Sequence, residues 1–143
     1  MLSSAGCWKV YGDVLAREYQ DISYWAVHRL TVDTYAAQHP FNEDKRNVRS
    51  VNIHLMTLYG VFELERPHKE MTEVLKKASK TNELKYSYLK PPKQLGQMTI
   101  QDVALAKNAK EHCKLVEDWS RSVWKSWTPH LETIKNNFQR IDS

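Results

Sequence analysis

The sequence predicts an all-α protein, a helical bundle of five or six helices folded as a single domain over residues 1–143. Apolar residues recur at steps of three and four along most of the chain, which is the period of an amphipathic helix. Segments with the alternating pattern of a β-strand are nearly absent. The 143 residues are 41% hydrophobic and 27% charged, with only four glycines. That size and composition are typical of one globular domain with one core.

The first expected helix covers about residues 5–19. Its apolar face is expected to consist of Trp8, Tyr11, Leu15 and Tyr19. A second helix is expected over residues 21–39, because Asp21 can accept hydrogen bonds from the first unpaired backbone N–H groups. Pro40 ends this helix, since proline cannot continue it.

A third helix is expected over about residues 47–63, and Pro67 is well suited to the first turn of a fourth helix that ends near residue 80. The apolar stripe of the third helix consists of Val51, His54, Leu55, Leu58 and Phe62. The fourth helix carries many lysines. The net charge of +4 therefore resides mainly in the middle of the chain.

Residues 83–98 are expected to form a long surface loop. Pro91, Pro92 and Gly96 interrupt any helix in this segment, and few apolar residues are present to anchor it. We expect it to be the most mobile internal part of the chain.

The last helical region begins at Thr99, which forms a capping-box pattern with Asp102. A long helix is expected to follow, with a break at Thr128 and Pro129, where proline removes a backbone donor. Its stripe has the clearest helical spacing in the chain: Leu105, Ala109, His112, Val116, Trp119, Val123, Trp127, His130 and Ile134.

Several protein classes are excluded by what the sequence lacks. No apolar stretch approaches the ~20 residues that span a bilayer, and the first residues lack the layout of a signal peptide, so we expect a soluble, cytoplasmic protein without membrane contact. Cys7 and Cys113 are too far apart for a CxxC zinc motif, and they do not form a disulfide framework. No GxSxG elbow or glycine-rich phosphate loop is present.

Four of the six histidines fall on predicted apolar stripes, which is unusual for a polar residue. They are His28, His54, His112 and His130. A buried imidazole needs partners for both ring nitrogens, and histidines that converge in a bundle can hold a transition metal. The sequence therefore suggests a cavity lined by histidines, with a divalent metal such as zinc or nickel as a candidate cofactor.

Helix geometry makes His28 and His54 the firmer pair. In an antiparallel hairpin across Pro40, His28 lies about 16 Å and His54 about 12 Å from the hairpin end, at ~1.5 Å per residue. The third ligand is either His112 or His130. Three nitrogens would leave one position open for water or a thiol substrate, which suits hydrolase or thiol-transfer chemistry.

The alternative interpretation is structural: each histidine is a core residue that bonds a carbonyl, a tyrosine or a serine. Tyr35 or Asp33 could assist a metal site, but Asp33 could also simply pair with Arg29. His39 and His68 are expected at helix ends and are not site candidates.

Two further functions compete with the metal site. The first is a non-catalytic protein that binds a small molecule in an aromatic pocket or assembles with copies of itself. The second is nucleic-acid binding through residues 76–93, where six lysines are interleaved with Tyr86 and Tyr88. The second is disfavoured, because no arginine cluster accompanies the lysines and such a pattern is typical of a solvated surface.

Four segments of the chain resemble a family of small bacterial proteins of unknown function. They are GCWKVYGDVLAREY (6–19), YWAVHRLTVDTYAAQHP (24–40), SVNIHL (50–55) and the cluster of Trp119, Trp124, Trp127 and His130. This resemblance spans most of the chain and implies no activity, substrate or cofactor.

The helical architecture also resembles, more distantly, the damage-inducible (DinB-like) bundles, in which three histidines bind a divalent metal. That resemblance concerns the fold. It implies His28, His54 and one of His112 or His130 as ligands.

Overall fold

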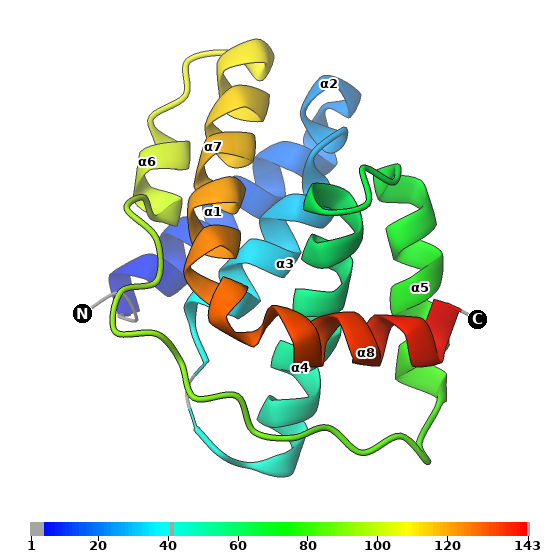
Figure 1. Ribbon diagram of the computed structural model, residues 1–143. Helices are drawn as coiled ribbons and strands as arrows, with labels where there is room; N and C mark the ends of the chain where they lie inside the picture. The colour runs from blue at the N-terminus through cyan, green and yellow to red at the C-terminus, as the bar shows by residue number, and fades with distance from the viewer. Residues whose placement is uncertain (1–4, 41, 143) are drawn as a thin grey trace.

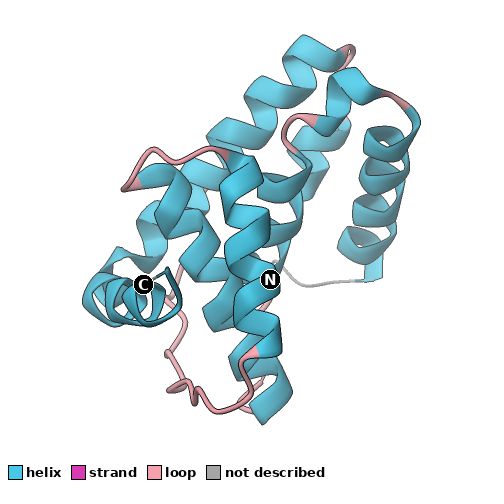
Figure 2. Ribbon diagram, turned by 90° about the vertical axis from the view of Figure 1, so that its right-hand side faces the viewer, coloured by secondary structure: helices cyan, strands magenta, loops and turns pink. Residues whose placement is uncertain are grey.

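A computed structural model describes residues 5–40 and 42–142 and confirms an all-α bundle (Figure 1). The longer helices are α1 (Ala5–Gln20), α3 (His28–Gln38), α4 (Lys45–Phe62), α5 (His68–Lys80), α7 (Ala109–Trp127) and α8 (Leu131–Asp142). Shorter pieces are α2 (Ile22–Trp25), α6 (Ile100–Ala104) and the 3-10 turn η1 (Thr128–His130). The described residues contain no β-strand (Figure 2).

The centre of the bundle is α3, which packs against α4 on one side and α7 on another. Helix α4 also contacts α5 and α8, and α8 runs across the bundle from the end of α7 toward α5 (Figure 1). Helix α1 packs against α2, α3 and α6. The core side chains of α3, α4 and α7 include Leu30, Leu55 and Trp119, each at most 1% exposed.

The apolar face predicted for the first helix is not the face that packs against the core. Trp8 and Tyr19 are 66% and 67% exposed, whereas the buried positions of α1 are Cys7, Val14 and Glu18. The buried positions follow the helical steps of seven and four, but they include a carboxylate. Aromatic residues on the neighbouring face made that face look like the core.

The helix predicted over residues 21–39 is two helices in the structure. Asp21 caps α2 as expected, accepting from the Ser23 backbone N–H at 2.9 Å. The chain then turns at Ala26 and Val27 before α3 begins. This turn brings His28 against α1, a tertiary contact that helical periodicity along the segment does not reveal.

The long helix predicted after Thr99 is also interrupted. The capping box of Thr99 and Asp102 is confirmed, but it opens only the short α6. A new helix starts after Asn108, whose side chain accepts from the Glu111 N–H at 2.9 Å, and Leu105 is left 75% exposed. The predicted break at Pro129 is confirmed by η1.

Residues 81–99 contain no helix or strand, and several hydrogen bonds tie them to the bundle. Gln38 donates its side-chain amide to the carbonyls of Leu95 and Met98, at 2.8 and 2.6 Å. The backbone of Gly96 has φ +82°, and a Cβ there would crowd Val123 on α7, so glycine suits this position.

In the described parts of the chain, every helix is too short or too polar to cross a lipid bilayer.

Candidate functional site

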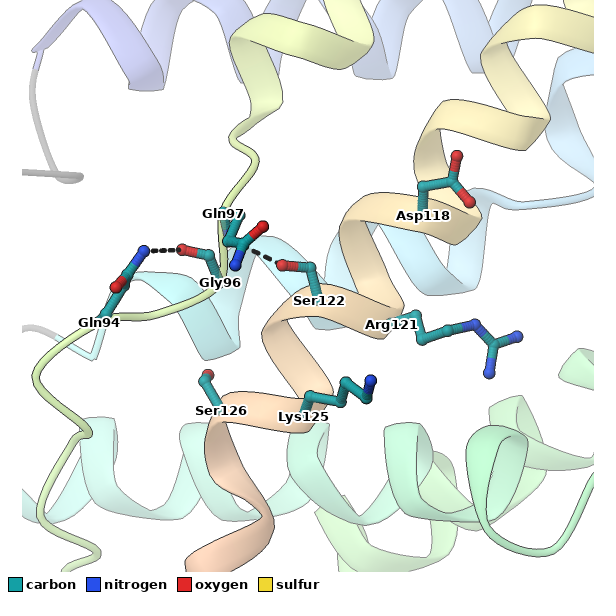
Figure 3. A pocket seen from close by; sticks show the side chains of 8 residues that line it. All are labelled: Gln94, Gly96, Gln97, Asp118, Arg121, Ser122, Lys125 and Ser126. Carbon is teal, nitrogen blue, oxygen red and sulfur yellow. Dashed lines mark hydrogen bonds between the residues drawn. The ribbon is translucent and has the colours of Figure 1, made fainter.

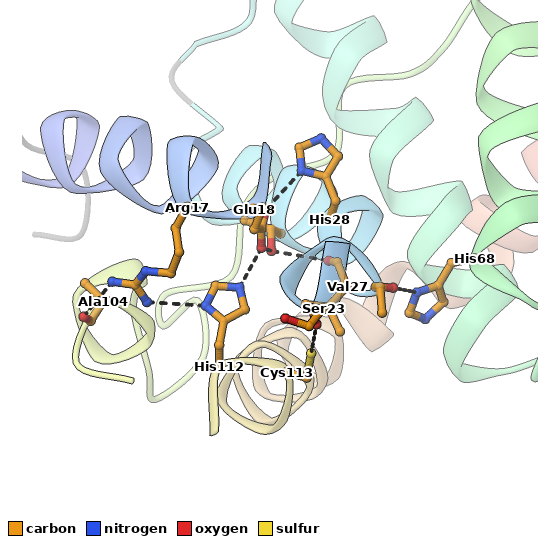
Figure 4. A network of polar contacts seen from close by, with 11 residues as sticks. Arg17, Glu18, Ser23, Val27, His28, His68, Ala104, His112 and Cys113 are labelled. Carbon is orange, nitrogen blue, oxygen red and sulfur yellow. Dashed lines mark hydrogen bonds and ion pairs between the residues drawn. The ribbon is translucent and has the colours of Figure 1, made fainter. Parts of the chain in front are cut away.

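The centre of the candidate site is Glu18, a carboxylate on α1 that is only 1% exposed. It accepts hydrogen bonds from His28 Nδ1 at 2.9 Å and His112 Nε2 at 2.8 Å, which approach from two directions (Figure 4). Thr31 Oγ1 donates a third bond at 2.6 Å. One buried carboxylate therefore joins α1 to both α3 and α7.

The hydrogen bonds to Glu18 outweigh its burial. Removal from water raises the pKa of a carboxyl group, but the bonds from His112, His28 and Thr31 stabilise the charged form and leave the pKa of Glu18 lowered overall. Glu18 is consequently ionised at neutral pH.

His112 is fully buried and uses both ring nitrogens inside the protein. Its Nε2–H donates to Glu18, and its Nδ1 faces Arg17 Nη1 at 3.4 Å. Because a guanidinium group can only donate, Nδ1 is the acceptor in this contact. Arg17 also donates to the Ala104 carbonyl at 3.1 Å. Because both ring nitrogens of His112 have partners inside the protein, this histidine has a structural role.

His28 uses only one ring nitrogen internally. Its Nδ1–H donates to Glu18, and no residue in the two described stretches hydrogen-bonds to its Nε2. The ring stacks on Trp25 at 4.1 Å with an interplanar angle of 9°, and Tyr19 contacts its edge at 5.0 Å. A carboxylate on one nitrogen fixes the tautomer and leaves the other as a proton acceptor or ligand.

His28 lines a cleft of about 580 Å³ where the starts of α3 and α5 meet. The lining consists of Trp25, Ala26, His28, Arg29, His68, Lys69, Thr72 and Glu73. His68, which the sequence did not suggest as a site residue, donates its Nδ1–H to the Ala26 carbonyl at 3.0 Å.

The unneutralised charge of this cleft is positive. Arg29 is paired with the buried Asp33 at 3.0 Å, and Glu73 is 3.6 Å from Lys76. Lys69 forms no ion pair with any residue that the structure describes. An anion would therefore meet its strongest attraction at Lys69.

A second carboxylate–histidine pair joins α3 and α4. The His54 Nδ1–H donates to Asp33 Oδ1 at 2.6 Å, and Asp33 is fully buried. The interpretation of Asp33 as a partner of Arg29 is confirmed, since Arg29 Nε lies 3.1 Å from Oδ2. His54 does not line the cleft that contains His28.

Two tyrosines lie close to these carboxylates. Tyr11 stacks on Tyr35 with 3.8 Å between ring centroids. Burial, with a smaller contribution from the charge of Glu18, raises the pKa of Tyr11 well above its usual range, and burial also raises that of Tyr35. Both phenols stay protonated at neutral pH and can only serve as hydrogen-bond groups.

The structure distributes the four predicted histidines over three places. His28 and His112 share Glu18, His54 is held by Asp33, and His130 bonds the Lys90 carbonyl at 2.9 Å through Nε2. Within residues 5–40 and 42–142, no three His, Cys, Asp or Glu side chains are grouped so that they could hold a metal ion. A metal on these histidines stays a prediction.

Sequence analysis missed Glu18, although one signal for it was present. Glu18 follows Tyr11 by seven residues and Val14 by four, which places it on the same helix face. A charged residue on a buried face requires partners, and both histidines that contact it lie on other predicted apolar stripes.

A second groove, of about 480 Å³, lies between the loop around Gly96 and α7 (Figure 3). Its exposed cations are Arg121, which stacks on the Phe62 ring at 4.9 Å, and Lys125. The Ser122 hydroxyl accepts from the Gln97 N–H at 2.7 Å. The residues that line it include no histidine or tyrosine, so it lacks a group suited to proton transfer near neutral pH.

Residues 1–128 match the sequence model of a family described as a family of unknown function (DUF5946). Searches of the curated proteins and of the solved structures found no match. The resemblance to the damage-inducible bundles is not confirmed by these comparisons.

Proposed function

The chain belongs to this family of unknown function, and we propose that it binds a small anionic molecule in the cleft where α3 and α5 begin, with His28 exchanging a proton with it. One observation carries the proposal: buried Glu18 holds His28 Nδ1 at 2.9 Å, and the ring lines the cleft. Imidazole is the side chain most often used for proton transfer near neutral pH.

The electrostatics of the cleft support an anion as the ligand. No residue that the structure describes forms an ion pair with the Lys69 ammonium group, and the Glu18 carboxylate contacts Nδ1 of His28 from behind. Protonation of His28 would add a second positive charge beside the ligand. We therefore expect anion binding and proton uptake to favour each other.

The proposal predicts pH-dependent binding of sulfate, a probe that does not itself titrate near neutral pH. Sulfate affinity, measured by NMR titration of the backbone amides, is expected to be several-fold higher at about pH 6 than at about pH 8, because the imidazolium attracts the anion. His28→Gln should remove most of this dependence, and Lys69→Gln should weaken binding at both pH values.

His130→Gln is the matched control, since its imidazole bonds the Lys90 carbonyl away from the cleft. His68→Gln tests the second imidazole of the cleft, and we expect it to keep most of the pH dependence. Sulfate binding that is equal at both pH values, or that persists unchanged in Lys69→Gln, would contradict the proposal.

A divalent metal ion is the second candidate ligand, held by His28 or His54. Metal-bound histidines commonly donate the other ring N–H to a carboxylate, as His28 and His54 do to Glu18 and Asp33. The interpretation predicts that protein purified without an affinity tag contains zinc or nickel by elemental analysis. His28→Ala and His54→Ala should each lower the metal content, because the two histidines lie at separate places. Metal-free protein that takes up neither ion on dialysis would exclude this candidate.

A further inference from the structure

We propose that the anion bound in this cleft is a small aromatic carboxylate, whose ring packs against Trp25 and Tyr19 while its carboxylate pairs with Lys69. The inference rests on the proposed anion site and adds the chemical class of the ligand. It comes from the aromatic rings at the edge of the cleft.

Three rings contact one another beside the cleft. Trp25 lies 4.1 Å from the His28 ring and 5.0 Å from the Tyr19 ring, and Tyr19 lies 5.0 Å from His28. Trp25 and Tyr19 are nevertheless 43% and 67% exposed. Large aromatic side chains clustered at the surface, next to a cleft, are typical of a site that buries an apolar ligand.

The apolar surface continues from the rings into the cleft itself. Ile22, one turn before Trp25, is 88% exposed, and Trp25 and Ala26 are part of the lining. His28 stacks on one face of the Trp25 ring, and Trp25 is still 43% exposed and part of the cleft lining. A flat apolar group can therefore reach Trp25 without displacing the Glu18–His28 contact.

The charges of the cleft favour a ligand with a single anionic group. Arg29 is already neutralised by Asp33, so Lys69 is the cation available to the ligand among the described lining residues. Glu73 would repel a second negative charge. A volume of about 580 Å³ is enough for a single ring with its carboxylate.

The experiment compares three probes on the full chain by NMR titration: benzoate, acetate and benzyl alcohol. Benzoate carries both the ring and the charge, acetate only the charge, and benzyl alcohol only the ring. Benzoate is expected to bind at least tenfold more tightly than either. Trp25→Leu and Tyr19→Leu should reduce benzoate affinity toward that of acetate while leaving the affinity for acetate unchanged.

Matched controls lie elsewhere on the surface. Tyr88→Leu removes another exposed aromatic ring, and Lys80→Gln removes another lysine of α5, and neither residue lines the cleft. Both variants should bind benzoate like the unmodified protein. Far-ultraviolet circular dichroism of each variant checks that the helices are intact.

The outcomes separate this inference from the proposed function. If acetate and sulfate bind as tightly as benzoate, and depend on Lys69 and pH as expected, the aromatic class is wrong and the anion site stands. If no anion binds at the cleft, both are wrong. Tight binding of benzyl alcohol would overturn the role of Lys69.

Discussion

Replacing Trp119 or Trp127 with alanine is expected to lower the free energy of unfolding by about 3–5 kcal/mol. Both side chains on α7 are fully buried, so truncation leaves a large cavity in the core. Each indole N–H also has a partner at 3.0 Å, the side-chain oxygen of Gln38 for Trp119 and the Ala37 carbonyl for Trp127. Truncation removes these buried hydrogen bonds, which adds to the cost.

Urea unfolding followed by circular dichroism measures this loss. Trp8→Ala is the matched control, because Trp8 is 66% exposed and its loss should change stability by no more than about 1 kcal/mol. Trp124 lies off the predicted stripe, a position that indicates a smaller contribution to the core. It is instead only 2% exposed and donates to Glu63 at 2.8 Å, so Trp124→Ala should also be strongly destabilising. Small losses at Trp119 and Trp127 would show that this face of α7 is not the core.

The features that sequence analysis predicted correctly are those that depend on local periodicity. Spacings of three and four place Val116, Trp119 and Val123 on one face of a helix wherever that helix packs, and all three are fully buried. The break at Pro129 follows equally from local chemistry, since proline has no N–H to donate.

The features that it predicted wrongly depend on contacts between distant segments. Nothing in the period of residues 21–39 requires a turn at Val27, but the turn allows His28 to reach Glu18 across ten residues of sequence. Asn108 was a visible capping residue. The predicted stripe nevertheless runs through this position from Leu105 to Ala109, whereas Leu105 is 75% exposed.

The candidate site was predicted only in part, for the same reason. His28 was identified from its stripe, but helix geometry paired it with His54 at a similar depth. In the structure each of these histidines has its own buried carboxylate, Glu18 for one and Asp33 for the other. A carboxylate can face a histidine from any helix, so sequence spacing within one helix does not identify the partner.

Glu18→Ala is expected to lower the free energy of unfolding at neutral pH by about 3–5 kcal/mol, because three donors lose a charged acceptor inside the fold. His112, Thr31 and His28 would each lose an acceptor.

The loss of stability in Glu18→Ala should depend on pH. The pKa of Glu18 is lowered in the folded state, so its ionised form contributes stability above the ordinary pKa of a glutamate, and that contribution disappears as the pH falls through the lowered value. Urea unfolding at several pH values should therefore show the unmodified protein and Glu18→Ala converging in acid, while Glu117→Ala, at an exposed position of α7, follows the unmodified protein throughout. A difference between Glu18→Ala and the unmodified protein that stays constant down to about pH 3 would show that the residue acts through packing and not through its charge.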